Sequence, residues 1–374
     1  MPEPAETVSP LLKSCPPSLP ATAYIDPQWY ARECDRIWRR EWIYAGRMND
    51  LPANTLRRVE TAAGACLVAR GAEDRVSAFL NVCPHRGAEL CGAADRDFNG
   101  ALITCPYHAW AYDLDGRLRA TAFATPTPDF DRAAHGLTGV AHRVWNGCLF
   151  LCLSDDPPDF SPDLGLAALD NWPMDRLVTG HAMEVELACN WKVFWENYNE
   201  CLHCPGIHPA LSRRVPVYRQ GVMSAAETSA PGAAGPALEP GTQSWTVDGR
   251  PCGPEFPDLS AAERAAGHTF VTIYPGVFLV AHVDYLRIVS LTPLAPERTR
   301  LWAEWLFAPE TLAAPGFDLG NVVDFAATVL AEDGAACEMN QRGLRTPGFR
   351  AGRLMPQEFE IRAFHDWVLA RLDD

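Results

Sequence analysis

The chain has 374 residues, of which 48% are hydrophobic and 21% charged, as expected for a folded protein of about two domains. Its formal net charge of −15 argues against a nucleic-acid partner, because nucleic-acid binding needs a basic face. The first twenty residues are rich in acids and prolines, and no apolar run reaches membrane-spanning length, so we expect neither a signal peptide nor a membrane partner. Without a secretory signal, the thirteen cysteines are interpreted as free thiols and metal ligands, and the expected compartment is the reducing cytoplasm.

The first half of the chain is predicted to contain a proline-rich tail, one helix and a small antiparallel β domain. The tail extends to about Thr22, and residues 25–42 carry apolar and aromatic side chains at helical spacing, with Asp26-Pro27 as cap and first turn. From Leu56 to Leu153, short β-rich runs alternate with Gly, Asp and Asn turns. Residues 155–163 are then expected to form a linker.

The second half is predicted to mix strands and helices. Residues 224–243, rich in Ala, Gly and Pro, are predicted to form a long mobile loop that covers the pocket entrance. Strands are expected at residues 182–187, 270–280, 285–292 and 300–306, and helices at residues 191–201, 319–341 and 356–372.

The first candidate metal site combines a C-x-H motif, Cys83 and His85, with a C-x-x-H motif, Cys105 and His108. Proline follows each cysteine, and nineteen residues separate the two motifs. Two cysteines and two histidines could hold structural zinc, but zinc fingers usually pair Cys with Cys and His with His. One Cys and one His from each loop instead suit a Rieske-type [2Fe–2S] cluster, with both cysteines on one iron and both histidines on the other.

The second candidate metal site lies in residues 190–209, which contain His203 and His208. Two positions five apart on an unbroken helix differ by about 140°, so these imidazoles would not face one metal there. Pro205 and Gly206 are therefore predicted to end the helix, with His203 at the helix end and His208 returning from the next loop.

Asn197, Glu200 and His203 are spaced by three and are expected to share one helix face, which places an amide and a carboxylate beside the metal-facing imidazole. An ordinary helix with capping and core histidines is the alternative. The upstream redox motif favours the metal site, because two histidines and one carboxylate with open positions suit an iron that activates O2. Acids that could supply the carboxylate are Asp324, Glu332, Asp333 and Glu338.

The chain resembles the alpha subunits of ring-hydroxylating Rieske non-haem iron oxygenases. The segments that carry the resemblance are CPHRG, CPYHAWAYDLDGRL, NWKVFWENYNECLHCPGIHP, AEDGAACEMNQRGL and residues 341–367. It implies an α+β chain with three parts: an N-terminal segment, residues 1–42, that packs on the catalytic domain; a small antiparallel-β Rieske domain, residues 43–157; and a helix-grip catalytic domain with a central antiparallel sheet, residues 158–374. The interval between the cluster motifs is slightly longer than usual in the family, which suggests an insertion around residues 94–100.

The resemblance also implies the cofactors, a [2Fe–2S] cluster and a mononuclear Fe(II). The iron ligands would be His203, His208 and the second acid of the Glu-Asp pair, Asp333, with Glu332 and Asp324 as alternatives. In the family, the acid at the position of Glu200 bridges an iron histidine of one subunit to a Rieske histidine of its neighbour, which implies an electron relay and a homotrimer. Since no G-x-G-x-x-G fingerprint occurs, NADH or NADPH is expected to act through a separate flavin- or ferredoxin-type reductase.

Two classes of function fit these motifs. The first is an oxygenase that uses O2 to hydroxylate a small organic substrate, a monooxygenase in preference to a dioxygenase. The pattern is most similar to the betaine, choline and carnitine branch, so N-demethylation or hydroxylation of a quaternary amine is the leading hypothesis, ahead of hydroxylation of an aromatic acid or ring. The second class is a non-catalytic Rieske electron carrier, which the chain length and the second histidine motif disfavour.

Quaternary ammonium groups bind to aromatic faces. Aromatic residues on the predicted strands are therefore candidates for substrate binding, although strand aromatics are also common in ordinary cores. The candidates are Phe270, Tyr274, Phe278 and Tyr285.

Overall fold

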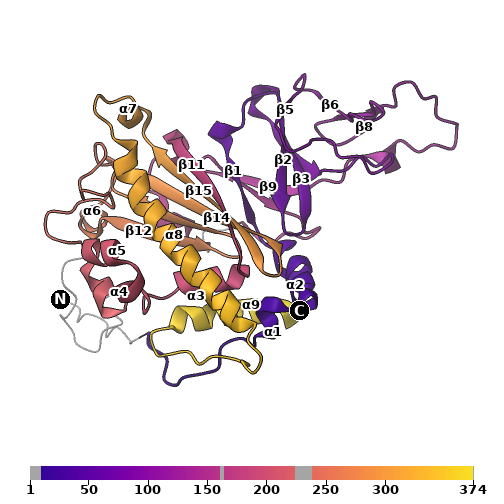
Figure 1. The fold of residues 1–374 in the computed structure, drawn as a ribbon. Helices are drawn as coiled ribbons and strands as arrows, with labels where there is room; N and C mark the ends of the chain where they lie inside the picture. The colour runs from indigo at the N-terminus through magenta and orange to yellow at the C-terminus, as the bar shows by residue number, and fades with distance from the viewer. Residues whose placement is uncertain (1–9, 161–163, 224–237, 374) are drawn as a thin grey trace, which may run out of the picture.

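The computed structural model describes residues 10–160, 164–223 and 238–373. Figure 1 shows a β-rich part beside a larger part, in which helices cover one face of a five-stranded sheet. The predicted α+β class, with a small β domain ahead of a domain with a central antiparallel sheet, is therefore confirmed. The proposed domain boundaries, at residues 42/43 and 157/158, stay a prediction.

The N-terminal segment forms three short helices, not the single helix predicted for residues 25–42. They are α1 (Thr22–Ile25), α2 (Pro27–Glu33) and a π-helical turn, η1 (Cys34–Trp38). Asp26 separates α1 from α2 and caps α2, because its side chain accepts a hydrogen bond from the Gln28 N–H at 2.8 Å. The helical stretch thus ends four residues earlier than predicted, at Trp38.

This segment anchors the helix that leads to the second candidate site. The Trp38 ring meets the Trp191 ring edge to face at 5.3 Å, and Trp191 is the first residue of α3 (Trp191–Tyr198). The Lys192 ammonium and the Glu33 carboxylate form an ion pair at 2.6 Å, with both side chains fully buried. Such a pair is costly to break, since one partner alone would leave an uncompensated buried charge.

The β-rich part contains three small antiparallel sheets. The strands are β1 (Ile43–Arg47), β2 (Thr55–Thr61), β3 (Gly64–Arg70), β4 (Val76–Leu80), β5 (Arg96–Asp97), β6 (Leu102–Thr104), β7 (Ala111–Asp113), β8 (Leu118–Ala120), β9 (Ala141–Trp145) and β10 (Cys148–Cys152). They pair in the orders β1-β10-β9, β4-β3-β2-β5 and β6-β7-β8. The small strand β5 lies in the suspected insertion and pairs with the start of β2.

The central sheet of the larger part has the order β11-β15-β14-β13-β12, with every neighbouring pair antiparallel. Its strands are β11 (Val178–Leu187), β12 (His268–Ile273), β13 (Val277–His282), β14 (Leu286–Ala295) and β15 (Arg298–Phe307). The single strand predicted at residues 270–280 is wrong, because β12 and β13 form a hairpin there. Pro275 lacks the N–H that a continuous ladder requires, so the chain turns at Tyr274–Gly276.

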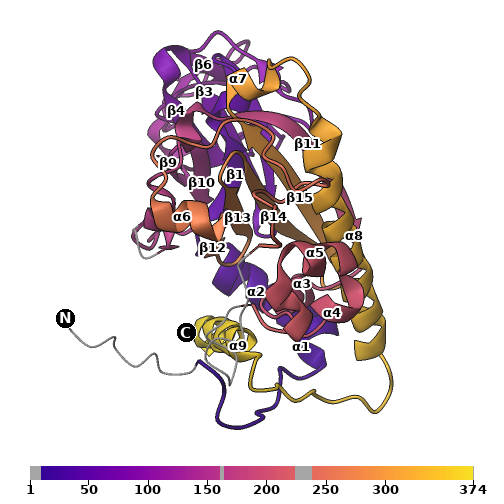
Figure 2. The same cartoon turned by 90° about the vertical axis from the view of Figure 1, so that its left-hand side faces the viewer.

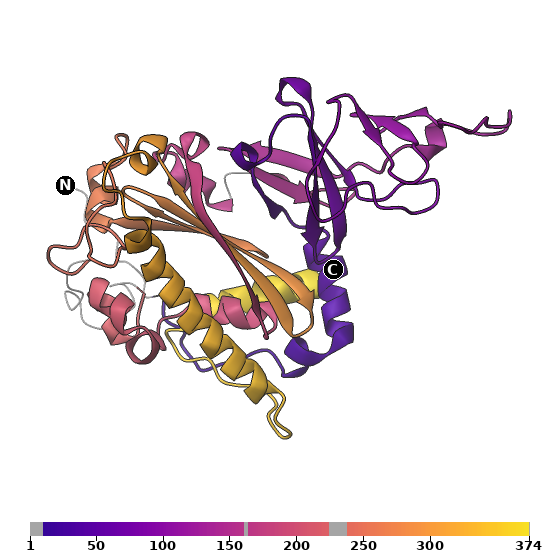
Figure 3. The same ribbon diagram turned by 45° about the horizontal axis from the view of Figure 1, so that its top comes forward.

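One face of this sheet packs against the β-rich part, and the other is covered by α3, α8 and α9. Figures 1 and 3 show the long helix α8 running diagonally across the sheet, and Figure 2 shows the same helix from the side, along one edge of the view. The remaining helices are α4 (Cys204–Ile207), α5 (Pro209–Arg214), α6 (Ala261–Ala266), α7 (Pro309–Leu312), α8 (Leu319–Leu344) and α9 (Phe359–Asp373). Short 3-10 turns are η2 (Met48–Asp50), η3 (Ala72–Asp74), η4 (Ala133–His135), η6 (Leu166–Leu169), η7 (Met174–Arg176) and η8 (Pro216–Gln220).

Two predicted segments fall partly outside the described residues: residues 161–163 of the linker and residues 224–237 of the pocket-covering loop. Within the described ranges, no helix is both long and apolar enough to cross a membrane.

Candidate functional site: two metal centres

The two cluster motifs fold into matching loops. The Cys83 N–H donates to the Ala88 carbonyl at 2.8 Å, and the Gly87 N–H donates back to the Cys83 carbonyl at 2.9 Å. In the second loop, the Cys105 N–H donates to Trp110 at 2.8 Å, and the Ala109 N–H donates to Cys105 at 3.0 Å. The fifth residue of each loop has a positive φ, 76° at Gly87 and 57° at Ala109. The chain therefore builds the same six-residue frame twice.

This frame separates the two kinds of donor. The cysteines are buried, at 1% exposure for Cys83 and 2% for Cys105, whereas His85 and His108 are partly exposed, with ring centroids 4.7 Å apart. Burial raises the pKa of the Cys83 thiol, and the adjacent Cys105 thiol adds to the rise. Two buried sulfurs side by side below two neighbouring imidazoles fit a cluster with one Cys-ligated and one His-ligated iron.

Two aromatic side chains hold this arrangement in place. The Trp110 ring stacks on the His85 ring, with centroids 4.3 Å apart and planes 8° apart. The Tyr112 hydroxyl lies 3.1 Å from the Cys83 Sγ and can donate a hydrogen bond to a thiolate there. Hydrogen bonds to ligand sulfurs are one of the means by which proteins set a cluster's potential.

The local structure around the second site differs from the prediction. Helix α3 ends at Tyr198, three residues before the expected end, so of Asn197, Glu200 and His203 only Asn197 lies on it. Pro205 and Gly206 do not end a helix: they lie within α4, where the proline occupies the first turn. The Glu200 side chain accepts hydrogen bonds from the Leu202 and His203 N–H groups and so forms the turn between α3 and α4.

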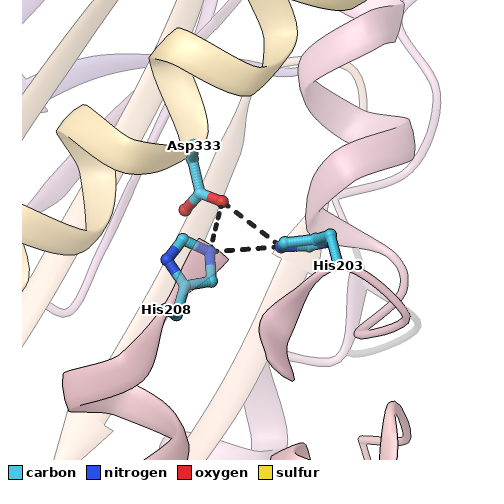
Figure 4. Close-up of side chains that lie close together, drawn as sticks. All are labelled: His203, His208 and Asp333. Carbon is cyan, nitrogen blue, oxygen red and sulfur yellow. Dashed lines mark hydrogen bonds and ion pairs between the residues drawn. The ribbon is translucent and has the colours of Figure 1, made fainter. Parts of the chain in front are cut away.

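Three side chains from two distant segments nevertheless converge (Figure 4). His203 precedes α4, His208 lies between α4 and α5, and Asp333 projects from α8. The Asp333 Oδ1 lies 2.8 Å from the His208 Nε2 and 3.4 Å from the His203 Nε2, and the two Nε2 atoms are 3.2 Å apart. Three ligands on one face of an octahedron, each about 2.1 Å from the metal, lie about 3.0 Å apart. The donor set and its spacing therefore fit a mononuclear metal with open positions on the far side.

Each imidazole is held from behind by a carboxylate. The His203 Nδ1 contacts the Glu200 Oε1, and the His208 Nδ1 lies 2.7 Å from the Glu332 Oε2. A carboxylate at Nδ1 fixes the tautomer that presents Nε2 to the metal. Asn197 is close to the same face, with its Nδ2 3.5 Å from the His203 Nε2.

The charges at the site are strongly coupled. Burial lowers the pKa of His203, but hydrogen bonds with Asp333 and Glu200 outweigh that effect and raise it to about 9. Burial would raise the pKa of Asp333, but hydrogen bonds with the two histidines lower it. A cation bound at the two Nε2 atoms and Asp333 would compete with the imidazole protons for the same positions.

A cavity of about 80 Å³ adjoins the three converging side chains. Of the four candidates for substrate binding, Phe270 and Phe278 line it, and Tyr274 and Tyr285 do not. The Tyr274 hydroxyl accepts a hydrogen bond from the Asn199 side chain, and the buried Tyr285 hydroxyl donates to the Trp245 carbonyl. Tyr285 directly precedes β14, and its buried side chain packs in the hydrophobic core with Phe278 and Phe307 and does not line the cavity.

Some features of the site were not apparent in the sequence. Glu332 appeared only as an alternative ligand, and its partner His208 is 124 positions away. Asp324, another alternative, is exposed and is not part of the converging group.

The expectation of free thiols is wrong for Cys201 and Cys204, which flank His203 and form a disulfide. Eleven other cysteines are free.

Comparison with known proteins agrees with this architecture. Residues 41–131 match the Rieske [2Fe–2S] domain family, and residues 174–374 match the ring hydroxylating alpha subunit (catalytic domain) family. The glycine betaine monooxygenase oxygenase subunit of Chromohalobacter salexigens is 31% identical, covering 95% of this chain and 87% of that protein. The chloroplastic choline monooxygenase of Beta vulgaris is 27% identical, covering 93% of this chain and 76% of that protein.

A solved structure of a quaternary ammonium Rieske monooxygenase in complex with L-carnitine shares the fold, with a TM-score of 0.71, 20% identity and 96% coverage of both chains. A naphthalene 1,2-dioxygenase from Rhodococcus shares it equally well, with a TM-score of 0.72 at 16% identity, over 96% of this chain and 95% of that one. Fold likeness alone thus does not separate amine from aromatic substrates. The chain belongs to the family of ring-hydroxylating alpha subunits, oxygenases that combine a Rieske [2Fe–2S] cluster with a mononuclear non-haem iron.

Proposed function

We propose that the chain is the terminal component of a multi-protein monooxygenase that demethylates or hydroxylates a quaternary amine. In this proposal Cys83, His85, Cys105 and His108 hold the cluster, and His203, His208 and Asp333 hold the iron. The observation that carries it is the cavity beside the three converging side chains, whose wall includes six aromatic side chains. Its aromatic lining consists of Phe194, Tyr198, Tyr218, Trp245, Phe270 and Phe278.

The aromatic wall suits a permanently charged amine. The Tyr198 and Phe278 rings lie 4.0 Å apart, and Trp245 and Phe270 lie 6.0 Å apart, so these rings form one aromatic group, and all four residues line the cavity. A trimethylammonium group is attracted to such faces and needs no hydrogen-bond donor or acceptor. The names of similar proteins, glycine betaine monooxygenase and choline monooxygenase, point to the same substrate class.

The protein's own groups prepare the site for chemistry that the iron supplies, the activation of O2. Asp333 keeps its negative charge, and Glu200 and Glu332 hold both imidazoles with Nε2 toward the metal. His203, His208 and Asp333 all line the cavity, so an iron held by them would lie beside a substrate bound there. The apolar lining limits water beside the reacting carbon.

We also propose that Glu200, with Asn197 beside it, relays electrons from the cluster of a neighbouring subunit in a homotrimer. Both residues line a surface groove of about 480 Å³ on the outer side of His203. Large apolar side chains at this groove are unusually exposed, 60% at Met339 and 41% at Phe349. On the cluster loops, Val82 and Tyr107 are similarly exposed, at 40% and 57%. Exposed apolar surface of this kind marks contact sites, and docking of one patch on the other would join a cluster to Glu200.

Electrons are proposed to come from NADH or NADPH through a separate reductase of the flavin or ferredoxin type. The purified chain, reconstituted with such a reductase, should consume O2 in the presence of one of betaine, carnitine or choline. Demethylation consumes one O2 and one NAD(P)H with one proton for each methyl group, and releases formaldehyde and water. Formaldehyde equal to NAD(P)H consumed is the expected result for demethylation, and a hydroxylated amine found by mass spectrometry is the expected result for hydroxylation.

Two outcomes would contradict the proposal. Product formation from aromatic acids alone would establish ring or acid hydroxylation in its place. Turnover with NAD(P)H but without a reductase would contradict the separate electron donor. Iron analysis adds a check on the cofactors, since a cluster plus a mononuclear site gives about three irons per chain, whereas a simple electron carrier gives two.

A further inference from the structure

A single arginine lines the cavity beside the converging side chains. Arg287 lies on β14, is 6% exposed, and shares the cavity wall with His203 and Asp333. Alternation along β14 directs it to the helix-covered face, the same face as Tyr285 and Val289. Its Nε is buried without a hydrogen-bond partner, and no carboxylate within the described ranges forms an ion pair with it.

A buried guanidinium without a counter-ion is costly, so its presence calls for a ligand or a functional reason. Burial lowers the pKa of Arg287, and the nearby charge of Asp333 acts against this effect. An arginine nevertheless remains charged in a protein. The cavity wall therefore carries one fixed positive charge that no described acidic side chain pairs.

A second buried donor belongs to a residue of the same cavity wall. Trp245 is 5% exposed and lines the cavity, and its indole Nε1 is likewise buried without an acceptor among the described residues. An indole N–H can only donate, and a guanidinium offers a planar fork of donors that matches the two oxygens of a carboxylate. Arg287 and Trp245 thus give one cavity wall two hydrogen-bond donors without acceptors, which is the pattern expected of a site for an anionic group of the ligand.

The other lining residues and the cavity volume indicate the remaining groups and the size of that ligand. The rings of Tyr198, Phe270 and Phe278 form the aromatic part of the wall. The cavity volume of about 80 Å³ corresponds to several water molecules, since one water needs about 10–15 Å³. A small zwitterion satisfies both requirements, with its ammonium group against the rings and its carboxylate on Arg287.

We propose that Arg287, assisted by Trp245, binds the carboxylate of the substrate, so that the enzyme selects quaternary ammonium compounds that carry a carboxylate over those that carry a neutral hydroxyl. The ammonium half of this statement rests on the proposed function. The carboxylate half rests on Arg287 and can be tested separately.

The test is a binding measurement on the purified iron-loaded protein without reductase, so that no turnover occurs. Titration calorimetry would compare glycine betaine, choline and benzoate. Choline keeps the trimethylammonium group of glycine betaine and replaces the carboxylate, and benzoate keeps only the carboxylate. Each would be titrated into wild type, Arg287→Met, Arg287→Lys and Arg298→Gln. Arg298 serves as the control because it lies on the neighbouring strand β15 with its side chain 55% exposed.

We expect wild type to bind glycine betaine at least tenfold more tightly than choline. Arg287→Met should weaken the binding of glycine betaine at least tenfold and the binding of choline less than twofold. The glycine betaine affinity of Arg287→Lys should lie between those of wild type and Arg287→Met, and both affinities of Arg298→Gln should match wild type. If Arg287→Met does not fold, the test is the ratio of glycine betaine affinity to choline affinity in Arg287→Lys, which should be lower than in wild type. Equal affinity of wild type for glycine betaine and choline, equal losses for both, or no binding of any carboxylate probe would overturn the role of Arg287.

The benzoate titration separates this inference from the proposed function. Binding of benzoate alone, lost in Arg287→Met, would support the anchor and overturn the quaternary-amine substrate. Binding of choline alone would support the quaternary amine and overturn the anchor.

Discussion

The two candidate metal centres are built in opposite ways. All four candidate cluster donors lie within residues 83–108, on two loops that share the same pair of backbone hydrogen bonds. The candidate iron donors come from the segment at residues 203–208 and from Asp333 on α8. They meet because α8 passes beside α4 and α5 (Figure 1). The first centre is a product of local chain geometry, and the second is a product of tertiary packing.

This difference has a functional consequence. A centre made by two short loops at the tip of a small domain can present its histidines at the surface, where electrons enter and leave. A centre made by distant elements lies at the wall of a cavity, where substrate can be held. The two centres should therefore respond differently to mutation, and the following changes test this.

The largest effect is expected from removing a donor at either centre. His203→Ala should reduce product formation to background while the cluster's visible absorbance survives, because its loops do not depend on α8. Cys83→Ser should abolish that absorbance and leave about one iron per chain. Absorbance spectra and iron analysis of both variants provide the measurement. Loss of the cluster in His203→Ala would show that the two centres are not independent.

A smaller effect is expected from the two carboxylates behind the histidines. Glu200→Gln and Glu332→Gln should both lower iron affinity about 10–100-fold, because each removes the carboxylate behind one iron-facing imidazole. In the iron-loaded protein, Glu200→Gln should also reduce the product formed per electron, because Glu200 faces the groove where a neighbouring cluster would dock. Glu332→Gln is the matched control, because Glu332 does not line that groove, and it should cost little coupling. Single-turnover measurements with a pre-reduced cluster distinguish the two, and equal coupling in both variants would remove the relay role from Glu200.

The same contrast explains which features the sequence could predict. The two loops that carry Cys83, His85, Cys105 and His108 were predictable because spacing within short segments encodes their geometry, and the assignment of these residues as cluster donors stays a prediction. The end of α3 differs from the prediction because side-chain contacts form the turn that follows it. The Glu200 carboxylate accepts hydrogen bonds from two backbone N–H groups, and the Asn199 side chain donates to the Tyr274 hydroxyl. The role proposed for Arg287 could not be predicted either, because sequence alternation does not reveal that the Nε of this buried arginine lacks a hydrogen-bond partner.

The junction between the two parts of the chain offers a test that depends on pH. Glu304 on β15 accepts a hydrogen bond from the Tyr44 hydroxyl on β1, and burial raises its pKa to about 7. The folded state therefore binds more protons than the unfolded state between about pH 4.5 and pH 7, and stability should fall as pH rises through that range. The total contribution is on the order of 3 kcal/mol, at about 1.4 kcal/mol per pKa unit.

Glu304→Gln should remove most of this slope in denaturant unfolding measured from pH 5 to pH 8. Glu184→Gln provides the control, because Glu184 lies on β11 of the same sheet with its side chain 55% exposed. An unchanged slope in Glu304→Gln would mean that another group causes it.

The smallest effect should come from Tyr112, which contacts the cluster centre without being a donor to it. Its hydroxyl lies 3.1 Å from the Cys83 Sγ, and a hydrogen bond to a thiolate stabilises the more negative, reduced cluster. Tyr112→Phe keeps the fully buried ring and removes only that bond, so the reduction potential should fall. A bond worth about 1–1.5 kcal/mol corresponds to about 40–60 mV for a one-electron couple. Potentiometric titration of the cluster absorbance measures the shift, and an unchanged or higher potential would show that Tyr112 does not donate to Cys83. Because the change leaves His203, His208 and Asp333 untouched, iron content should stay the same, which confines the effect to the locally built centre.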